Sequence, residues 1–169
     1  MLPYQEHVGC GRFYKWIFGS VLALLAILFI YVMIVVVPFS TGEYGNATVA
    51  IFAVSVLILV ASVVVFAAWN SRVLDVKVDW SGLIVRYGIF NSKQLKISEI
   101  VRSEAVQLPV GAYWGIGVRY GIDGSTAYIT SFGEAVKVFL NDGRVFVFSS
   151  NHSANVIEAL AEARASTQS

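Results

Sequence analysis

The stretch WIFGSVLALLAILFIYVMIVVV, from Trp16 to Val37, decides how this chain is organised, because it contains no charged residue. A helix rises about 1.5 Å per residue, so about 20 apolar residues cross a hydrocarbon layer of about 30 Å. A second uncharged stretch runs from Ala47 to Trp69. Its many valines and isoleucines favour strands in water, but in lipid a single segment satisfies its backbone hydrogen bonds only as a helix. The sequence therefore predicts two membrane-spanning helices, at 16–37 and 47–69.

A cleaved signal peptide is the alternative explanation of the first stretch. Such a peptide has an apolar region of about 7–15 residues followed by a small-x-small cleavage site. The apolar run here is longer, and the residues after it, Val37-Pro38-Phe39-Ser40, offer no such site. We therefore expect a retained helix.

Basic residues at the ends of the two stretches predict their orientation. Arg12 and Lys15 precede the first stretch, and Arg72 and Lys77 follow the second. The loop between the stretches contains Glu43 and no basic residue. Because cytoplasmic flanks of membrane helices carry an excess of lysine and arginine, we expect a multi-pass protein with both termini in the cytoplasm.

The composition agrees with a membrane protein and argues against other classes. Of the 169 residues, 57% are hydrophobic and 14% are charged, whereas a soluble domain has about 45–50% and about 25%. The net charge of +1 and the lack of a basic stripe predict no nucleic-acid partner. The single cysteine, Cys10, excludes an internal disulfide and a thiolate metal site. It is either a free thiol or a juxtamembrane acylation site.

The remaining residues, 70–169, predict one water-facing β domain, preceded by the helical hairpin at 16–69 and a cytoplasmic tail at 1–15. Short alternating apolar runs are separated by turn residues such as DWSG and NDGR, a pattern typical of an antiparallel sheet. The Asn-Asp-Gly sequence of NDGR is the clearest hairpin signal. Strands are expected at 73–78, 83–87, 93–97, 100–105, 115–120, 127–131, 135–140 and 145–148.

The pattern changes after the last of these strands. Val156, Ile157, Leu160 and Ala161 recur at helical spacing, and the preceding Ser-Ser-Asn supplies capping residues. We expect a helix that ends near residue 165 and closes an open end of a small barrel or sandwich.

This order of elements resembles the bacterial pleckstrin-homology-like domain, which follows two or more membrane helices in many small bacterial proteins. The segments that carry the resemblance lie between Trp114 and Leu160: WGIGVRY, a DG turn, AYIT, AVKVFLNDGRVFVFSS and a closing helix that contains IEAL. The resemblance implies an α+β or mainly-β domain, a small barrel of about seven antiparallel strands with a C-terminal helix. It also implies the inner membrane of a bacterium and a docking role without catalysis.

Residues that carry catalysis are sparse. His7 lies in the tail, and His152 lies at the start of the last expected helix. For His152, the two interpretations are a surface or capping residue and a pH-sensitive contact. No HExxH, GxSxG or P-loop pattern occurs. Asp75 and Asp79 fit a solvated sheet face better than an acid–base pair. We expect no catalytic residue, no cofactor and no metal site.

One apolar connection is a candidate contact surface. The segment 106–114 joins two expected strands, and its Leu108, Pro109, Tyr113 and Trp114 are candidates for contact with a partner or with the membrane. The alternative is that Trp114 plugs the core of the domain.

A weaker candidate surface is basic. Arg72, Lys93 and Lys96 could attract an anionic leaflet, at about 1 kcal/mol per residue near the surface. Specific inositide binding is not favoured, because Asp79 lies between Lys77 and Arg86 around the first expected hairpin.

The sequence thus predicts a non-enzymatic accessory, assembly or scaffold subunit of a membrane complex. Its expected partners are the lipid bilayer and either another membrane protein or a second copy of the chain. A membrane-tethered module that senses lipid headgroups is the main alternative, and a membrane enzyme with an unrecognised site is a third.

Overall fold

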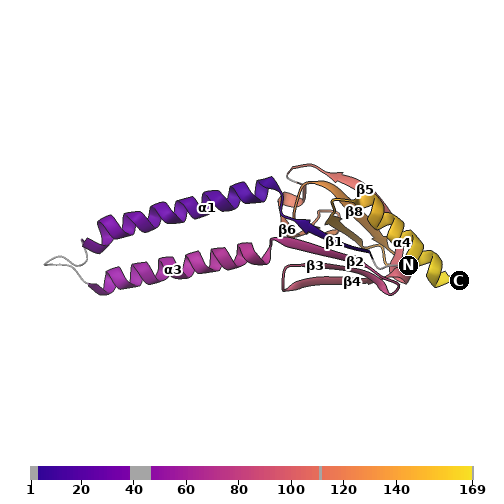
Figure 1. Cartoon of the computed structure of the whole chain (residues 1–169), viewed down its shortest axis with the longest axis horizontal. Coiled ribbons are helices and arrows are strands. Elements are labelled where there is room, and N and C mark those ends of the chain that lie inside the picture. The colour runs from indigo at the N-terminus through magenta and orange to yellow at the C-terminus, as the bar shows by residue number, and fades with distance from the viewer. Residues whose placement is uncertain (1–3, 39–46, 111, 169) are drawn as a thin grey trace. The chain divides into compact units, whose positions relative to one another are not determined.

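The chain folds into two compact units in a computed structural model that describes residues 4–38, 47–110 and 112–168 (Figure 1). One unit is helical and runs from Lys15 to Trp69. The other combines the described residues up to Tyr14 with those from Asn70 onward. The described residues before the first apolar stretch therefore belong to the folded β unit, whereas the sequence predicted a separate tail at 1–15.

The helical unit holds the two apolar stretches. α1 spans Arg12–Tyr31 and continues into a π-helical turn at Val32–Val36, and α3 spans Ala47–Asn70. Among the described residues, these are the two helices long and apolar enough to cross a membrane. Only 6% and 11% of their most apolar windows are buried, whereas the core helix of a water-soluble protein is mostly buried. The predicted connection with Glu43 lies outside the described residues.

The first sheet of the β unit contains four antiparallel strands in the order β1-β2-β3-β4. Three of them were predicted: β2 (Val73–Val78), β3 (Gly82–Tyr87) and β4 (Asn91–Lys96). The fourth, β1, is formed by Tyr4–Gly9, which pairs along the whole of β2. Side chains alternate between the core and solvent along β2, as the alternating sequence predicts.

The second sheet contains five strands in the order β5-β8-β9-β7-β6. The bounds of these strands are Ile100–Leu108 for β5, Gly133–Leu140 for β8, Val145–Ser149 for β9, Thr126–Ile129 for β7 and Gly117–Tyr120 for β6. The neighbours β7 and β9 run parallel, and every other pair is antiparallel. The helix α4 (Ser153–Gln168) follows β9, close to the predicted position.

These sheets confirm a β unit with a C-terminal helix but correct the predicted barrel. The described residues form nine strands in two separate sheets, and no closed barrel is present. The difference from about seven antiparallel strands has two causes: the N-terminal tail adds β1, and the short β7 pairs in parallel with β9.

The core of the β unit draws side chains from both sheets and from α4. Phe146 and Phe148 of β9 are buried, and so are Val156 and Leu160 of α4. Val156 and Leu160 therefore lie in the core, as the sequence predicted, whereas the predicted Ala161 is exposed and Ala163 is buried instead. Burying each such side chain contributes about 1.5–3 kcal/mol relative to leaving it in water.

Candidate functional site

The strand β5 is an open edge of the second sheet. It pairs with β8 on one side, and no strand among the described residues pairs with its other side. Its nine residues make it the longest of the described strands, and no side chain from Val101 to Gln107 is buried. An edge strand presents unpaired backbone N–H and C=O groups, which form a template for another strand.

The edge strands differ in how they are protected. β6 has only four residues, and β4 carries Lys93 and Lys96. Short length, lysine and β-bulges are devices that limit edge pairing. β5 has a bulge near its start, between Ile100 and Arg102, but its pairing with β8 is regular from Arg102 to Leu108. Along β5, the only charges are Arg102 and Glu104, which pair with each other (Nη2 to Oε2, 3.1 Å).

A groove adjoins the first half of this edge. Its walls are β5 at Ile100–Ser103 and one side of α4, which contributes Ile157, Leu160, Ala161, Arg164 and Ala165. Arg164 Nη1 donates a hydrogen bond to the backbone carbonyl of Val101 (2.7 Å) and so ties α4 to the edge. Figure 1 shows α4 next to the β5 end of the sheet. An open strand edge beside an apolar helix face has the features that bind an extended peptide.

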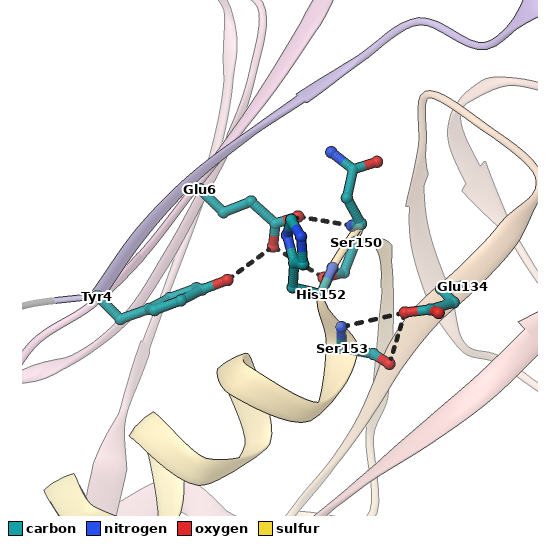
Figure 2. A network of polar contacts seen from close by, with 7 residues as sticks. Tyr4, Glu6, Glu134, Ser150, His152 and Ser153 are labelled. Carbon is teal, nitrogen blue, oxygen red and sulfur yellow. Dashed lines mark hydrogen bonds and ion pairs between the residues drawn. The ribbon is translucent and has the colours of Figure 1, made fainter.

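A buried carboxylate joins β1 to the start of α4 (Figure 2). Glu6 is 7% exposed and accepts hydrogen bonds from Ser150 Oγ (2.8 Å), from the backbone N–H of Asn151 (2.6 Å) and from Tyr4 Oη (3.3 Å). His152 Nδ1 lies 3.6 Å from Glu6 Oε1. Burial raises the pKa of Tyr4 to about 12, and the charge of Glu6 and their hydrogen bond add to this shift.

The hydroxyl of Ser150 is held on both sides within this network. Ser150 Oγ donates to Glu6 and accepts from the backbone N–H of His152 (3.1 Å). Ser150 is also buried. Next to it, Glu134 Oε2 accepts from the backbone N–H and the Oγ of Ser153, at the N-terminus of α4, where a carboxylate is stabilising.

The apolar connection predicted as a contact surface divides into buried and exposed parts. Leu108 ends β5 and is buried in a small cluster with Ile129 and Val147, while Pro109 is exposed. Tyr113 Oη accepts a hydrogen bond from Ser125 Oγ (3.0 Å).

Trp114 points away from the core. It is 83% exposed, so the alternative in which this side chain plugs the core is wrong. Both Tyr113 and Trp114 have positive φ angles, 54° and 61°. With Ile122, they line a shallow apolar depression.

The basic residues predicted to contact lipid do not form one patch. Arg72 precedes β2, whereas Lys93 and Lys96 lie on β4 opposite Val85 and Gly82. Side chains alternate along a strand, so Lys93 shares the face of the buried Leu95 and Lys96 points to the other face.

Two features of the β unit were not predicted from the sequence. The β3–β4 turn carries the exposed Ile89 and Phe90, and Glu6 joins β1 to the segment before α4. The first could have been found from the pair of large apolar residues in the turn YGIFN. The second depends on a contact between residues 144 apart and gives no local signal.

Comparison with family models, with curated protein sequences and with solved structures gives no match. The described residues contain no group of three or more His, Cys, Asp or Glu side chains that could hold a metal ion.

Proposed function

We propose that this chain is a non-enzymatic membrane protein whose β unit docks an extended segment of another membrane protein. The two apolar helices anchor the chain as a multi-pass protein of a bacterial inner membrane, and the β unit is a pleckstrin-homology-like docking module. In this proposal the chain acts as an accessory, assembly or scaffold subunit of a membrane complex.

The open edge of β5 is the observation that carries the proposal. A partner segment that adds as a strand at this edge gains backbone hydrogen bonds, and alternate side chains gain contacts in the groove beside α4. Ile157 and Leu160 line that groove. A long exposed edge otherwise invites aggregation. A bound partner would also explain why β5 contains no lysine or proline beyond the Arg164 contact at Val101.

Basic residues support a cytoplasmic position for the β unit. Arg12 and Lys15 precede the first apolar stretch, and Arg72 follows the second. Cytoplasmic flanks of membrane helices carry this excess of positive charge. Docking would then occur on the cytoplasmic face of the membrane.

The lipid-sensing alternative receives less support. Headgroup recognition needs basic side chains that converge, but Lys93 and Lys96 point to opposite faces of β4. The open strand edge of the second sheet, with the groove beside α4, fits a polypeptide partner better than a headgroup.

Site-specific photo-crosslinking in native membranes tests the docking proposal. A photoreactive phenylalanine analogue replaces Ala105 or Gln107 on β5, and in a matched control it replaces Gln94 on β4; all three positions are exposed. We expect one dominant adduct from the β5 positions, with the crosslinked peptide in a single segment of another membrane protein. Equal labelling from all three positions, or no adduct from β5, contradicts the proposal. An adduct with a second copy of the chain would mean that β5 mediates self-association and does not bind another membrane protein.

A charge variant tests the edge itself. Ala105→Lys gives β5 the protection that β4 already has, so it should reduce recovery of the crosslinked complex several-fold when the analogue is at Gln107. Gln94→Lys adds the same charge to β4 and should leave recovery unchanged. Both substitutions replace exposed residues, and near-ultraviolet circular dichroism of each purified variant checks that the β unit is folded.

A further inference from the structure

One end of the β unit is the end at which the chain enters α1 and returns from α3. Asn70 is the last residue of α3, and its Oδ1 accepts a hydrogen bond from the backbone N–H of Ile89 (2.8 Å). The neighbouring Gly88 donates its N–H to the carbonyl of Val73 (3.4 Å). The β3–β4 turn is therefore fixed beside the residue that directly follows Trp69.

The loop that follows β5 lies at the same end of the β unit. Gly11, which precedes α1, donates its N–H to the carbonyl of Thr130 (3.2 Å), just after β7. Gly133 follows shortly and pairs with Leu108, the last residue of β5. Val110, two residues beyond Leu108, therefore lies near this end as well.

The exposed side chains of both loops are apolar. Ile89 is 68% exposed, Phe90 71% and Val110 74%. Large apolar side chains at loop tips are costly in water when they gather at one end of a domain. The residues that flank the apolar stretches at this end, Arg12 and Arg72, are basic and exposed. Apolar tips beside basic residues match the bilayer interface, where apolar groups enter the acyl boundary and cations meet anionic headgroups.

We propose that the β3–β4 turn is a membrane-contact site, at which Ile89 and Phe90 enter the interfacial layer of the bilayer and Val110 contacts the same layer. This inference rests on the proposed membrane crossing of α3. If α3 crosses the bilayer, Asn70 lies at its surface, and a turn whose backbone is 2.8 Å from the Asn70 side chain lies there too. Each headgroup layer is about 5–8 Å thick, deep enough to hold two side chains.

Such a contact gives the β unit a second attachment to the membrane besides the covalent link. A unit held only by the chain could rotate about the two connections. Insertion of Ile89 and Phe90 holds the β3–β4 end of the first sheet against the membrane surface. The orientation of the β unit, and with it the direction in which the edge of β5 faces, is then fixed.

Spin-label accessibility in bilayers tests this site. The full chain, with Cys10→Ser, is reconstituted into vesicles of equal parts phosphatidylcholine and phosphatidylglycerol, and single cysteines are labelled with a nitroxide. The labelled positions are Ile89→Cys, Trp80→Cys as a matched control, and Ile58→Cys within α3. Trp80 is exposed like Ile89, but it lies in the β2–β3 turn at the opposite end of the first sheet.

The ratio of oxygen to nickel-chelate collisions reports depth. We expect a ratio at Ile89→Cys that is several-fold higher than at Trp80→Cys and lower than at Ile58→Cys. A ratio at Ile89→Cys equal to that at Trp80→Cys, with a high ratio at Ile58→Cys, overturns the contact site while the membrane crossing stands. A low ratio at Ile58→Cys overturns the membrane crossing and this inference with it.

Discussion

The Oγ of Ser150 donates a hydrogen bond of 2.8 Å to the carboxylate of Glu6, joining two residues 144 positions apart. One of them lies before the first apolar stretch and the other lies just before α4. The contact joins the two parts of the β unit that precede and follow the helical segment in the sequence. The N-terminal residues are thus part of the fold of the β unit.

Replacing Glu6 should destabilise the β unit. Glu6→Ala leaves the buried Ser150 Oγ and the part-buried backbone N–H of Asn151 without their acceptor, which costs about 1–3 kcal/mol. A urea titration of the full chain in detergent, followed by near-ultraviolet circular dichroism, measures the loss. The control is Glu104→Ala, which removes an exposed pair with Arg102 and should cost less than about 1 kcal/mol. Equal losses for the two variants would contradict the buried role of Glu6.

Local signals predicted the elements that follow from turn chemistry. The sequence NDGR forms the β8–β9 turn as expected: Asp142 Oδ1 accepts from the backbone N–H of Arg144 (2.9 Å), and Gly143 has a φ of 82°. Gly143 adopts this left-handed conformation without the clash that a Cβ would cause. A similar turn forms at DWSG, where a hydrogen bond from Ser81 lowers the pKa of Asp79.

Long-range contacts account for what the sequence did not predict. The inward face of β1 carries the charged Glu6, so the strand lacks the regular alternation of apolar and polar residues that predicts a half-buried strand. Its sequence therefore resembles that of a polar tail. Only partners far along the chain, such as Ser150, make that burial favourable. The end of β5 was also missed, because the run from Val106 looked like an apolar connection, although Leu108 is buried and Pro109 is the residue that ends the strand.

Alkaline pH should destabilise the β unit through Tyr87. Burial raises the pKa of this phenol from 10.0 to about 12, and the nearby Tyr14 adds to the shift. Between pH 10 and 12, the unfolded chain releases the Tyr87 proton while the folded chain retains it, so stability falls as pH rises. We expect Tyr87→Phe to flatten the dependence of urea stability on pH in this range. An unchanged dependence would show that Tyr87 does not titrate late.

Gly88 should resist substitution more strongly than another glycine of similar backbone conformation. Its φ is 62°, and a Cβ there would lie 2.1 Å from the carbonyl oxygen of Asn70. Gly124 has a φ of 76°, but a Cβ there meets nothing within 4 Å. Gly124→Ala should therefore cost only the left-handed conformation, about 1–2 kcal/mol, and Gly88→Ala should cost more in the same urea titration. Similar costs would mean that the β3–β4 turn shifts easily from Asn70.

Thr130 should tolerate loss of its hydroxyl, whereas the neighbouring Ser149 should not. Its side chain is fully buried, and within the described part of the chain its Oγ1 has no hydrogen-bond partner. Thr130→Val keeps the shape and removes a buried polar group, so we expect it to stabilise the β unit by about 1 kcal/mol.

Ser149→Ala is the contrasting variant, because Ser149 Oγ accepts from the N–H of Thr130 (3.2 Å) and donates to the carbonyl of Ser131 (2.8 Å). This variant should lose about 1–3 kcal/mol. A destabilising Thr130→Val would contradict this prediction and would mean that a buried water molecule binds the hydroxyl. Hydrogen exchange at the backbone amide of position 130 would then increase in that variant.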